Sequence, residues 1–324
     1  MTEFETGHAR ADAHGLMKQK NSPGFDYETV VFGKRSYFAR SAPNLGGVRL
    51  HRYLQAVETN EGVSGWHILE VGCGAGVFSR SIARCLPLDH VFGTDVSRKA
   101  AAIANRLDGK VYYSVGDAQQ LPMSEKSFDS VVFFDLLEHL PDPDAALSEF
   151  HRVLKPNGLL HGYVPCEGNP FTLYWIVAKI GLGYRLTERH AGHIHHFAAK
   201  DVKQSLEQSG FILEKCSYSG QLMGQLLDLA TFLVRELIHR RRGFMIRSEN
   251  ELLPRNGFFY DRSALGTGTL SKIYGVVRRF LDAIVYVEAR LLAWLPWAMG
   301  LHFTARKLVE ELGSEGSVSD PSDV

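Results

Sequence analysis

The sequence is poor in cysteine and has no excess of charge of either sign. Its four cysteines, Cys73, Cys85, Cys166 and Cys216, lie far apart and include no C-x-x-C pair. This spacing argues against a zinc knuckle or a disulfide framework and favours a reducing compartment such as the cytoplasm. Lysine and arginine together number 36, the same as aspartate and glutamate. Because phosphate binding needs a strong positive field, nucleic acid is not expected as a partner.

Long apolar segments are also missing. The first residues, MTEFETGHARADAHG, contain no apolar core of the kind that secretory signals have. The nearest candidate for a membrane span lies between Arg290 and Arg306 and is shorter than the roughly 20 apolar residues that a helix needs to cross a bilayer. We therefore expect a cytoplasmic protein that is not integral to a membrane.

What the sequence does contain is a segment in which short apolar strands alternate with helices. It follows a helix whose apolar positions are Leu50, Tyr53, Leu54 and Val57. Strands are predicted at 67–71, 90–94, 111–115, 130–134, 158–164 and 211–217, and helices at 77–85, 97–106, 143–153 and 201–209. This alternation predicts an α/β fold with a parallel sheet covered on both faces.

Composition divides the chain into four parts. Residues 1–45 are polar and are predicted to form a flexible N-terminal arm, and residues 46–220 form the α/β domain, with an aromatic insertion at about 165–200 that could cover a substrate. Residues 221–312 are apolar with scattered basic residues and are predicted to form an appended C-terminal helical region. The tail at 313–324 is rich in Ser, Gly and Asp, which is typical of disorder.

The densest functional signal is the run Ile-Leu-Glu-Val-Gly-Cys-Gly-Ala-Gly at 68–76. Gly72, Gly74 and Gly76 permit a tight turn and let a ligand approach the backbone where a Cβ would clash. The second strand ends at Asp95, about twenty residues further on, where doubly wound sheets carry an acid that binds ribose hydroxyls. An ordinary turn and a helix N-cap are the alternatives for each feature alone. Together, the loop and the acid indicate a nucleoside site.

These residues resemble the class I methyltransferases that use S-adenosylmethionine, particularly the small-molecule branch that includes ubiquinone and menaquinone biosynthesis enzymes. The loop is Gly-x-Gly-x-Gly, not the Gly-x-Gly-x-x-Gly that cradles a pyrophosphate. The similarity extends over about residues 60–217 and continues through five blocks: Gly116-Asp117-Ala118, Leu121-Pro122, Phe128-Asp129, Leu137-Glu138-His139-Leu140 and Leu154-Lys155-Pro156-Asn157-Gly158. The resemblance implies S-adenosylmethionine as methyl donor and a Rossmann-like doubly wound, mostly parallel sheet with an antiparallel final strand.

The resemblance also implies a cofactor site that is distributed over the first four strands. Its residues are Glu70, Gly72, Cys73, Gly74, Gly76, Asp95, Val96, Asp117, Ala118 and Phe133. Glu70, the loop backbone and the Phe133 carbonyl would hold the methionine moiety. Asp95 would bind the ribose and Val96 would lie against the adenine. Asp117 would accept a hydrogen bond from the adenine amino group, with Ala118 beside the ring.

Histidines supply the candidates for catalysis. A methyl transfer needs a base only if the nucleophile must lose a proton. His139 follows the fourth strand, and His193 belongs to a cluster at 190–196. We name both as candidate catalytic residues, with structural roles as the alternative. No metal is expected, because neither cysteines nor a carboxylate cluster accompanies these histidines in the sequence.

The sequence of the helical region is compatible with more than one binding partner. Residues 221–242 and 273–295 are apolar helices with basic residues, followed by Trp294 and Trp297. This composition suits a helix that lies in a membrane interface, which would make the protein a peripheral membrane protein. Packing on the core or against a second subunit, as in a homo-oligomer, is the alternative.

The sequence therefore predicts a methyltransferase that acts on a small, apolar acceptor such as an isoprenoid, quinone, lipid or secondary metabolite. A nicotinamide-dependent oxidoreductase is the alternative enzyme, but its glycine pattern is missing. Its Tyr-x-x-x-Lys motif also fails, since Ala178 follows Tyr174 and Arg278 follows Tyr274 at that offset. A non-catalytic partner protein that binds S-adenosylmethionine is the third hypothesis.

Overall fold

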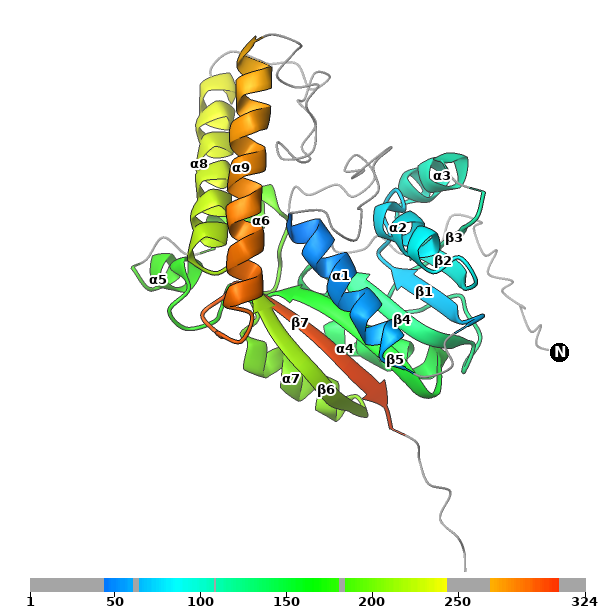
Figure 1. The fold of residues 1–324 in the computed structure, drawn as a ribbon. Coiled ribbons are helices and arrows are strands. Elements are labelled where there is room, and N and C mark those ends of the chain that lie inside the picture. The colour runs from blue at the N-terminus through cyan, green and yellow to red at the C-terminus, as the bar shows by residue number, and fades with distance from the viewer. Residues whose placement is uncertain (1–43, 61–63, 108, 181–183, 244–268, 309–324) are drawn as a thin grey trace, which may run out of the picture.

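The computed structural model describes residues 44–60, 64–107, 109–180, 184–243 and 269–308 (Figure 1). The predicted tail at 313–324 and nearly all of the predicted arm at 1–45 lie outside these residues. The strands are β1 (His67–Val71), β2 (His90–Asp95), β3 (Tyr112–Val115), β4 (Phe128–Phe134), β5 (Leu154–Pro165), β6 (Phe211–Ser219) and β7 (Gly300–Lys307). The helices are α1 (Leu45–Glu58), α2 (Val77–Cys85), α3 (Arg98–Leu107), the 3-10 turn η1 (Leu137–His139), α4 (Pro143–Val153), α5 (Leu173–Lys179), α6 (Arg185–His190), α7 (Ala199–Gln208), α8 (Leu222–Gly243) and α9 (Thr269–Leu291).

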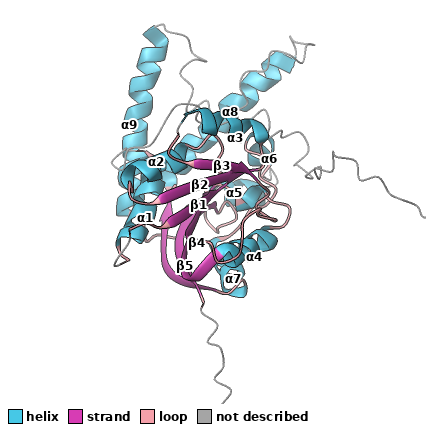
Figure 2. Cartoon of the chain, turned by 90° about the vertical axis from the view of Figure 1, so that its right-hand side faces the viewer, coloured by secondary structure: helices cyan, strands magenta, loops and turns pink. Residues whose placement is uncertain are grey.

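The strands form one sheet in the order β3-β2-β1-β4-β5-β7-β6. Strands β1 to β5 pair in parallel, and β7 runs antiparallel to both of its neighbours, β5 and β6. Figure 2 shows the sheet between its helical layers. The predicted Rossmann-like, mostly parallel sheet with an antiparallel final strand is confirmed.

Both faces are covered at the centre of the sheet, which explains why β1 and β4 are mostly apolar and buried. Leu69 and Val71 of β1 point to a core cluster that includes α4 and α7, whereas Ile68 belongs to a second cluster with α1 and α2. The second cluster contains the residues that predicted α1, namely Leu50, Tyr53, Leu54 and Val57, and all four are buried. The carboxyl ends of the parallel strands consequently lie together at one edge, where ligands bind in such folds.

The seventh strand, β7, is formed by residues 300–307, which the sequence analysis places in the helical region. Leu301, Phe303 and Ala305 alternate with His302 and Thr304. The three apolar side chains enter the core, while the two polar ones are buried on the other face. His302 pairs with the Ser219 hydroxyl at 2.8 Å and Thr304 pairs with His161 at 3.0 Å. The assignment of a purely helical C-terminal region was therefore wrong, because the strand's period of two was overlooked.

Helices α8 and α9 lie beyond the sheet and splay apart from their shared base. They overlap in the view of Figure 1, but the rotated view of Figure 2 shows them diverging. At the base, the carboxylate of Glu288 on α9 accepts hydrogen bonds from the backbone N–H groups of Met223 and Gly224, at 2.9 and 3.1 Å. Arg52 of α1 donates to the carbonyls of Ala289 and Tyr218. These bonds fix the base of the pair to the α/β core.

None of the helices in the described ranges has both the length and the apolar character to cross a membrane.

Candidate functional site

The glycine loop between β1 and α2 is a compact backbone turn. Gly72, Gly74 and Gly76 have φ angles of +74°, +53° and +75°, a region that side chains with a Cβ rarely adopt. The N–H groups of Gly72 and Cys73 donate to the carbonyl of Thr94, at 2.8 and 3.0 Å. The loop is thus bonded to the end of β2, and the three glycines are required by the backbone geometry itself.

The loop is tightly packed at both ends and open in the middle. A Cβ on Gly76 would lie 2.2 Å from the hydroxyl of Tyr113, and one on Gly72 would lie 2.9 Å from the side chain of Leu136. A Cβ on Gly74 would meet no atom within 4 Å. The middle glycine therefore faces space that a ligand can occupy, which a purely structural turn does not require.

Asp95 joins the loop at the carboxyl end of β2. Its Oδ2 accepts a hydrogen bond from the Gly74 N–H at 2.7 Å, and its Oδ1 accepts one from the Ser97 N–H at 2.8 Å. The structure thus brings together the two features that the sequence placed 21 residues apart. A carboxylate held beside an open backbone loop is suited to accept hydrogen bonds from the hydroxyls of a ribose.

The residues expected around the adenine lie on the neighbouring strand end. The N–H of Gly116 donates to the carbonyl of Asp95 at 3.1 Å, so the ends of β2 and β3 meet. Asp117 follows, with Oδ1 accepting from the Gln119 N–H at 2.9 Å, and Ala118 is buried. Val96 is 37% exposed, which leaves an apolar surface next to Asp95. The binding roles of these residues stay predictions.

Glu70 lies behind the loop. It is buried, and its carboxyl accepts a hydrogen bond from the Ser79 hydroxyl of α2. Burial raises the pKa of Glu70 to about 8, against the lowering effect of the Ser79 hydrogen bond. The carboxyl is therefore largely protonated near neutral pH, and its bond to Ser79 joins β1 to α2. Its expected contact with the methionine amino group stays a prediction.

Phe133 and Asp135 mark the end of β4. Phe133 pairs with Val71 of β1, and its buried ring packs 5.3 Å from that of Phe150. Asp135, which the sequence analysis missed, has a φ of +48°, an uncommon value for a residue other than glycine. Its carboxylate forms a two-pronged ion pair with Arg49 of α1. The position of Asp135 directly after a parallel strand was the signal that could have found it.

The two candidate catalytic histidines lie against each other, although they come from segments that are distant in the sequence. Gly192, which precedes His193, is 53 residues from His139. Their rings meet edge to face, with centroids 5.0 Å apart. His139 uses Nδ1 to contact the Gly192 carbonyl at 3.1 Å, and His193 uses Nδ1 to contact Glu167 at 2.8 Å. The backbone carbonyl of Glu138 accepts from the N–H groups of Ile194 and His195, which fixes this segment beside η1.

Glu167 organises the histidine cluster, and the sequence analysis did not identify it. It is buried and contacts the Nδ1 atoms of His193 and His196, at 2.8 and 2.7 Å, and the hydroxyl of Thr187 at 2.9 Å. Burial alone would raise the pKa of Glu167, but His193 and His196 outweigh it and lower the pKa to about 2. No local spacing pairs Glu167 with histidines that follow 26 and 29 residues later.

The shared environment of His139 and His193 shifts their pKa values in opposite directions. Burial lowers the pKa of His139 to about 3. Burial would also lower the pKa of His193, but the charge of Glu167 raises it to about 9. Neither pKa lies near neutrality, where a general base is most effective. His139 is consequently neutral and His193 charged at pH 7 in this arrangement.

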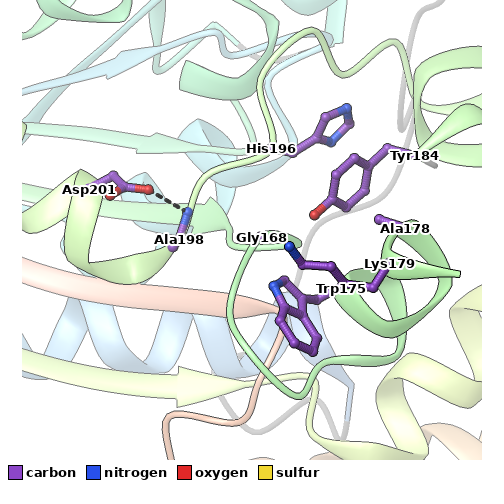
Figure 3. Close-up of a pocket in the computed structure, with 8 residues that line it drawn as sticks. All are labelled: Gly168, Trp175, Ala178, Lys179, Tyr184, His196, Ala198 and Asp201. Carbon is purple, nitrogen blue, oxygen red and sulfur yellow. Dashed lines mark hydrogen bonds between the residues drawn. The ribbon is translucent and has the colours of Figure 1, made fainter. Parts of the chain in front are cut away.

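A pocket of about 330 Å³ is lined mostly by residues of the insertion and includes His196, which contacts Glu167. It is lined by Gly168, Trp175, Ala178, Lys179, Tyr184, His196, Ala198 and Asp201 (Figure 3). Tyr184 stacks on His196 with ring centroids 4.0 Å apart, and Trp175 and Lys179 lie across from them. The insertion thus provides an aromatic pocket next to the histidine cluster.

Comparison with known proteins identifies the family. A methyltransferase domain matches residues 69–161, which contain the loop, Asp95, Asp117 and the end of β4. The ubiquinone biosynthesis O-methyltransferase of Ralstonia nicotianae is 31% identical over 176 residues, which cover 53% of this chain and 71% of that protein. The chain belongs to the class I S-adenosylmethionine-dependent methyltransferases. In three other curated relatives the match spans 46%, 38% and 66% of the relative, so the chain covers about half of their length.

Solved structures share the fold of this chain. The cyclase SpnF superposes with a TM-score of 0.51 at 19% identity, over 87% of this chain and 88% of that one. A candidate methyltransferase from Bacillus halodurans C-125 superposes with a TM-score of 0.50 at 19% identity, over 81% of this chain and 100% of that one. Because the first of these is named a cyclase, the fold alone does not decide the reaction.

Proposed function

We propose that this chain transfers a methyl group from S-adenosylmethionine to a small, apolar acceptor. The proposal is carried by the loop at 72–76, whose middle residue, Gly74, faces open space while its N–H contacts the carboxylate of Asp95. An adenosyl cofactor without phosphates fits such a loop, because it needs close backbone approach and a ribose acceptor but no anion site. The cofactor supplies a methyl carbon that its sulfonium already activates.

In this proposal the protein binds the cofactor and orients the acceptor toward its methyl group. Asp95 accepts hydrogen bonds from the ribose hydroxyls, and Asp117 accepts one from the adenine amino group while Val96 covers the ring. The loop backbone and the carbonyl of Phe133 hold the methionine end. With the cofactor fixed at the edge of the sheet, an acceptor need only be held in line with the methyl–sulfur bond for displacement.

Three observations support an apolar acceptor. The named relative acts in ubiquinone biosynthesis. The pocket beside the histidine cluster has aromatic walls, formed by Trp175 and Tyr184. Large apolar side chains are also exposed around the insertion and the base of the helix pair, among them Phe171, Ile180 and Leu222. We therefore propose that the segment at about 165–200 covers an isoprenoid, quinone, lipid or similar secondary metabolite.

We further propose that helices α8 and α9 rest on a membrane surface that presents this acceptor. Phe280, Leu291, Trp294 and Trp297 are exposed by 67%, 69%, 73% and 56%. Exposed tryptophans beside an apolar helical face suit the boundary between headgroups and acyl chains. The base of the pair packs on the core, as the alternative interpretation expected, but this packing leaves these side chains uncovered.

Thermal unfolding with candidate ligands tests the proposed cofactor use. S-adenosylhomocysteine and S-adenosylmethionine should raise the midpoint of unfolding in proportion to the logarithm of their concentration, and NAD should leave it unchanged. A shift with NAD alone would favour the oxidoreductase and end this proposal.

Mass spectrometry tests turnover. Lipid and small-molecule extracts from cells with and without the gene should differ by species that are heavier by one methylene group. If the cofactor binds but no such species depends on the gene or on added enzyme, the non-catalytic partner hypothesis replaces this one.

A further inference from the structure

Three side chains that could ligate a metal converge next to the glycine loop. The ligand atoms of Glu138, His139 and His193 all lie within 4.8 Å of one another. Glu138 and His139 belong to η1, which follows β4, and His193 comes from the segment after the insertion. Leu136, just before η1, would contact a Cβ on Gly72, so the cluster adjoins the glycine loop. The cluster therefore lies at the ligand-binding edge of the sheet.

The carboxylate of Glu138 lacks the partners that a buried charge requires. Glu138 is fully buried, and within the described part of the chain neither of its carboxylate oxygens has a hydrogen-bond partner. Nε2 of His139 lies 3.6 Å from its Oε1. Burying an unsatisfied carboxyl costs several kcal/mol, which is about the cost that a bound cation or proton removes. The uncompensated carboxyl of Glu138 therefore indicates that a cation or a proton binds between it and the two histidines.

The surroundings of both histidines match those of metal ligands. Metal-bound imidazoles nearly always engage their second ring nitrogen with a carboxylate or a backbone carbonyl. His193 contacts Glu167 through Nδ1, and His139 contacts the Gly192 carbonyl through Nδ1. In each ring this leaves Nε2 as the nitrogen for the cluster. Glu167 is in turn held by Thr187 and His196, so the outer contacts are themselves fixed.

We propose that Glu138, His139 and His193 bind one divalent first-row transition metal ion such as Zn²⁺, Fe²⁺ or Mn²⁺. Two imidazoles and one carboxylate favour these ions over Mg²⁺ and Ca²⁺, which prefer oxygen ligands alone. Ligands at bond lengths of about 2.1 Å in a tetrahedral site lie about 3.4 Å apart, close to the separation of His139 and Glu138. Three protein ligands leave at least one coordination position for water or an acceptor.

The role of this metal ion rests on the proposed methyl transfer. An acceptor hydroxyl bound at the open position loses its proton to solvent more readily, because the cation stabilises the alkoxide or phenolate. That oxygen then forms a bond to the methyl carbon as the carbon–sulfur bond breaks, which gives a methyl ether and S-adenosylhomocysteine. His139 and His193 thereby act as ligands, and His193 gives up the proton that Glu167 stabilises on it when the ion binds.

Metal binding by the full chain tests the site directly. The purified protein is stripped with a chelator, dialysed, and titrated with Zn²⁺, Co²⁺ and Mg²⁺ by calorimetry. We expect one Zn²⁺ per chain, visible absorption from bound Co²⁺, and no Mg²⁺ binding at comparable concentrations. Absence of Zn²⁺ and Co²⁺ binding, or binding of Mg²⁺ alone, overturns the proposal.

Variants locate the binding. Glu138→Gln and His193→Ala should each weaken Zn²⁺ binding at least about 100-fold. His195→Ala should not, because that neighbouring ring contacts the Leu140 carbonyl and lies outside the cluster. Equal affinity in all four proteins would mean that other histidines bind the ion. Circular dichroism and thermal unfolding establish which variants fold.

If the ligand variants do not fold, X-ray absorption of the wild-type protein with Zn²⁺ decides the matter. Two imidazoles and a carboxylate oxygen in the coordination shell support the site, and any other protein ligand set overturns it. Zn²⁺ binding without a thermal shift from S-adenosylhomocysteine would end the proposed function but keep the site. A thermal shift with S-adenosylhomocysteine but no Zn²⁺ binding would overturn the metal site and keep the proposed function.

Discussion

The backbone N–H of Gly74 donates a hydrogen bond of 2.7 Å to Oδ2 of Asp95, which ties the glycine loop to the end of β2. The same carboxylate is the expected acceptor for the ribose. Asp95 thus shapes the loop and, in the proposed function, also binds the ligand. Its removal should impair cofactor binding through both.

Substitution of Asp95 separates these tasks. Asp95→Ala should weaken S-adenosylhomocysteine binding about 100-fold or more, since hydrogen bonds to a charged group contribute about 1.5–3 kcal/mol each. Asp95→Asn, which keeps one oxygen acceptor, should weaken it less. Calorimetric titration measures both. Asp142→Ala is the control: Asp142 caps α4 through the Ala145 N–H, so its loss should lower stability but not affinity. Unchanged affinity in Asp95→Ala would show that the ribose binds elsewhere.

A matched pair of glycines tests whether the open middle of the loop receives the cofactor. Gly74 and Gly65 have φ angles of +53° and +79°, and a Cβ on either would meet no atom within 4 Å. Both Gly→Ala substitutions should therefore cost about 1–2 kcal/mol of stability from backbone strain alone. Only Gly74→Ala should also weaken S-adenosylhomocysteine binding, since its Cβ would enter the ligand's space. Equal affinities of the two variants would contradict this assignment.

Glu70 should make stability depend on pH. Its folded pKa, about 8, lies above the ordinary value of 4.5, so the folded state holds a proton that the unfolded state releases. Its contribution is fully present below pH 4.5 and is lost as the pH rises through about 8, with a slope of up to about 1.4 kcal/mol per pH unit.

The variant Glu70→Gln isolates this effect, because the amide cannot titrate. Denaturant unfolding from pH 5 to pH 9 should show that the free energy of unfolding of the variant, relative to wild type, rises with pH. A difference that stays constant across this range would mean that Glu70 does not bind a proton on folding.

Exposed tryptophans should mediate membrane contact. Co-sedimentation with vesicles of phosphatidylcholine and phosphatidylserine should retain the wild-type protein and lose much of the variant Trp294→Gln/Trp297→Gln. Tyr112→Gln is the matched control, because Tyr112 is a similarly exposed aromatic residue on edge strand β3, apart from the helix pair. Equal retention of all three proteins, or retention of none, would remove the membrane from the proposed function.

The parts of the site that sequence analysis located are those with a local backbone or periodic cause. Gly72, Gly74 and Gly76 are recognisable because their φ angles are permitted to few other residues, and Asp95 because a strand of regular length ends there. The buried strands were found since each is a short apolar run. Strand β7 was the exception, although Leu301, Phe303 and Ala305 alternate visibly, because it follows two long helices and pairs with strands that are distant in the sequence.

The sequence by itself therefore determined the α/β fold, the glycine loop and its acidic partner, because these depend on residues that are neighbours in the chain or repeat at a fixed period. Only the tertiary structure decided that Glu167 holds His193 and His196, and that Glu138 and His139 face His193. These contacts join segments whose separation carries no pattern. Folding brings them together at the edge of the sheet, where burial and the neighbouring charges together set the charge of each side chain.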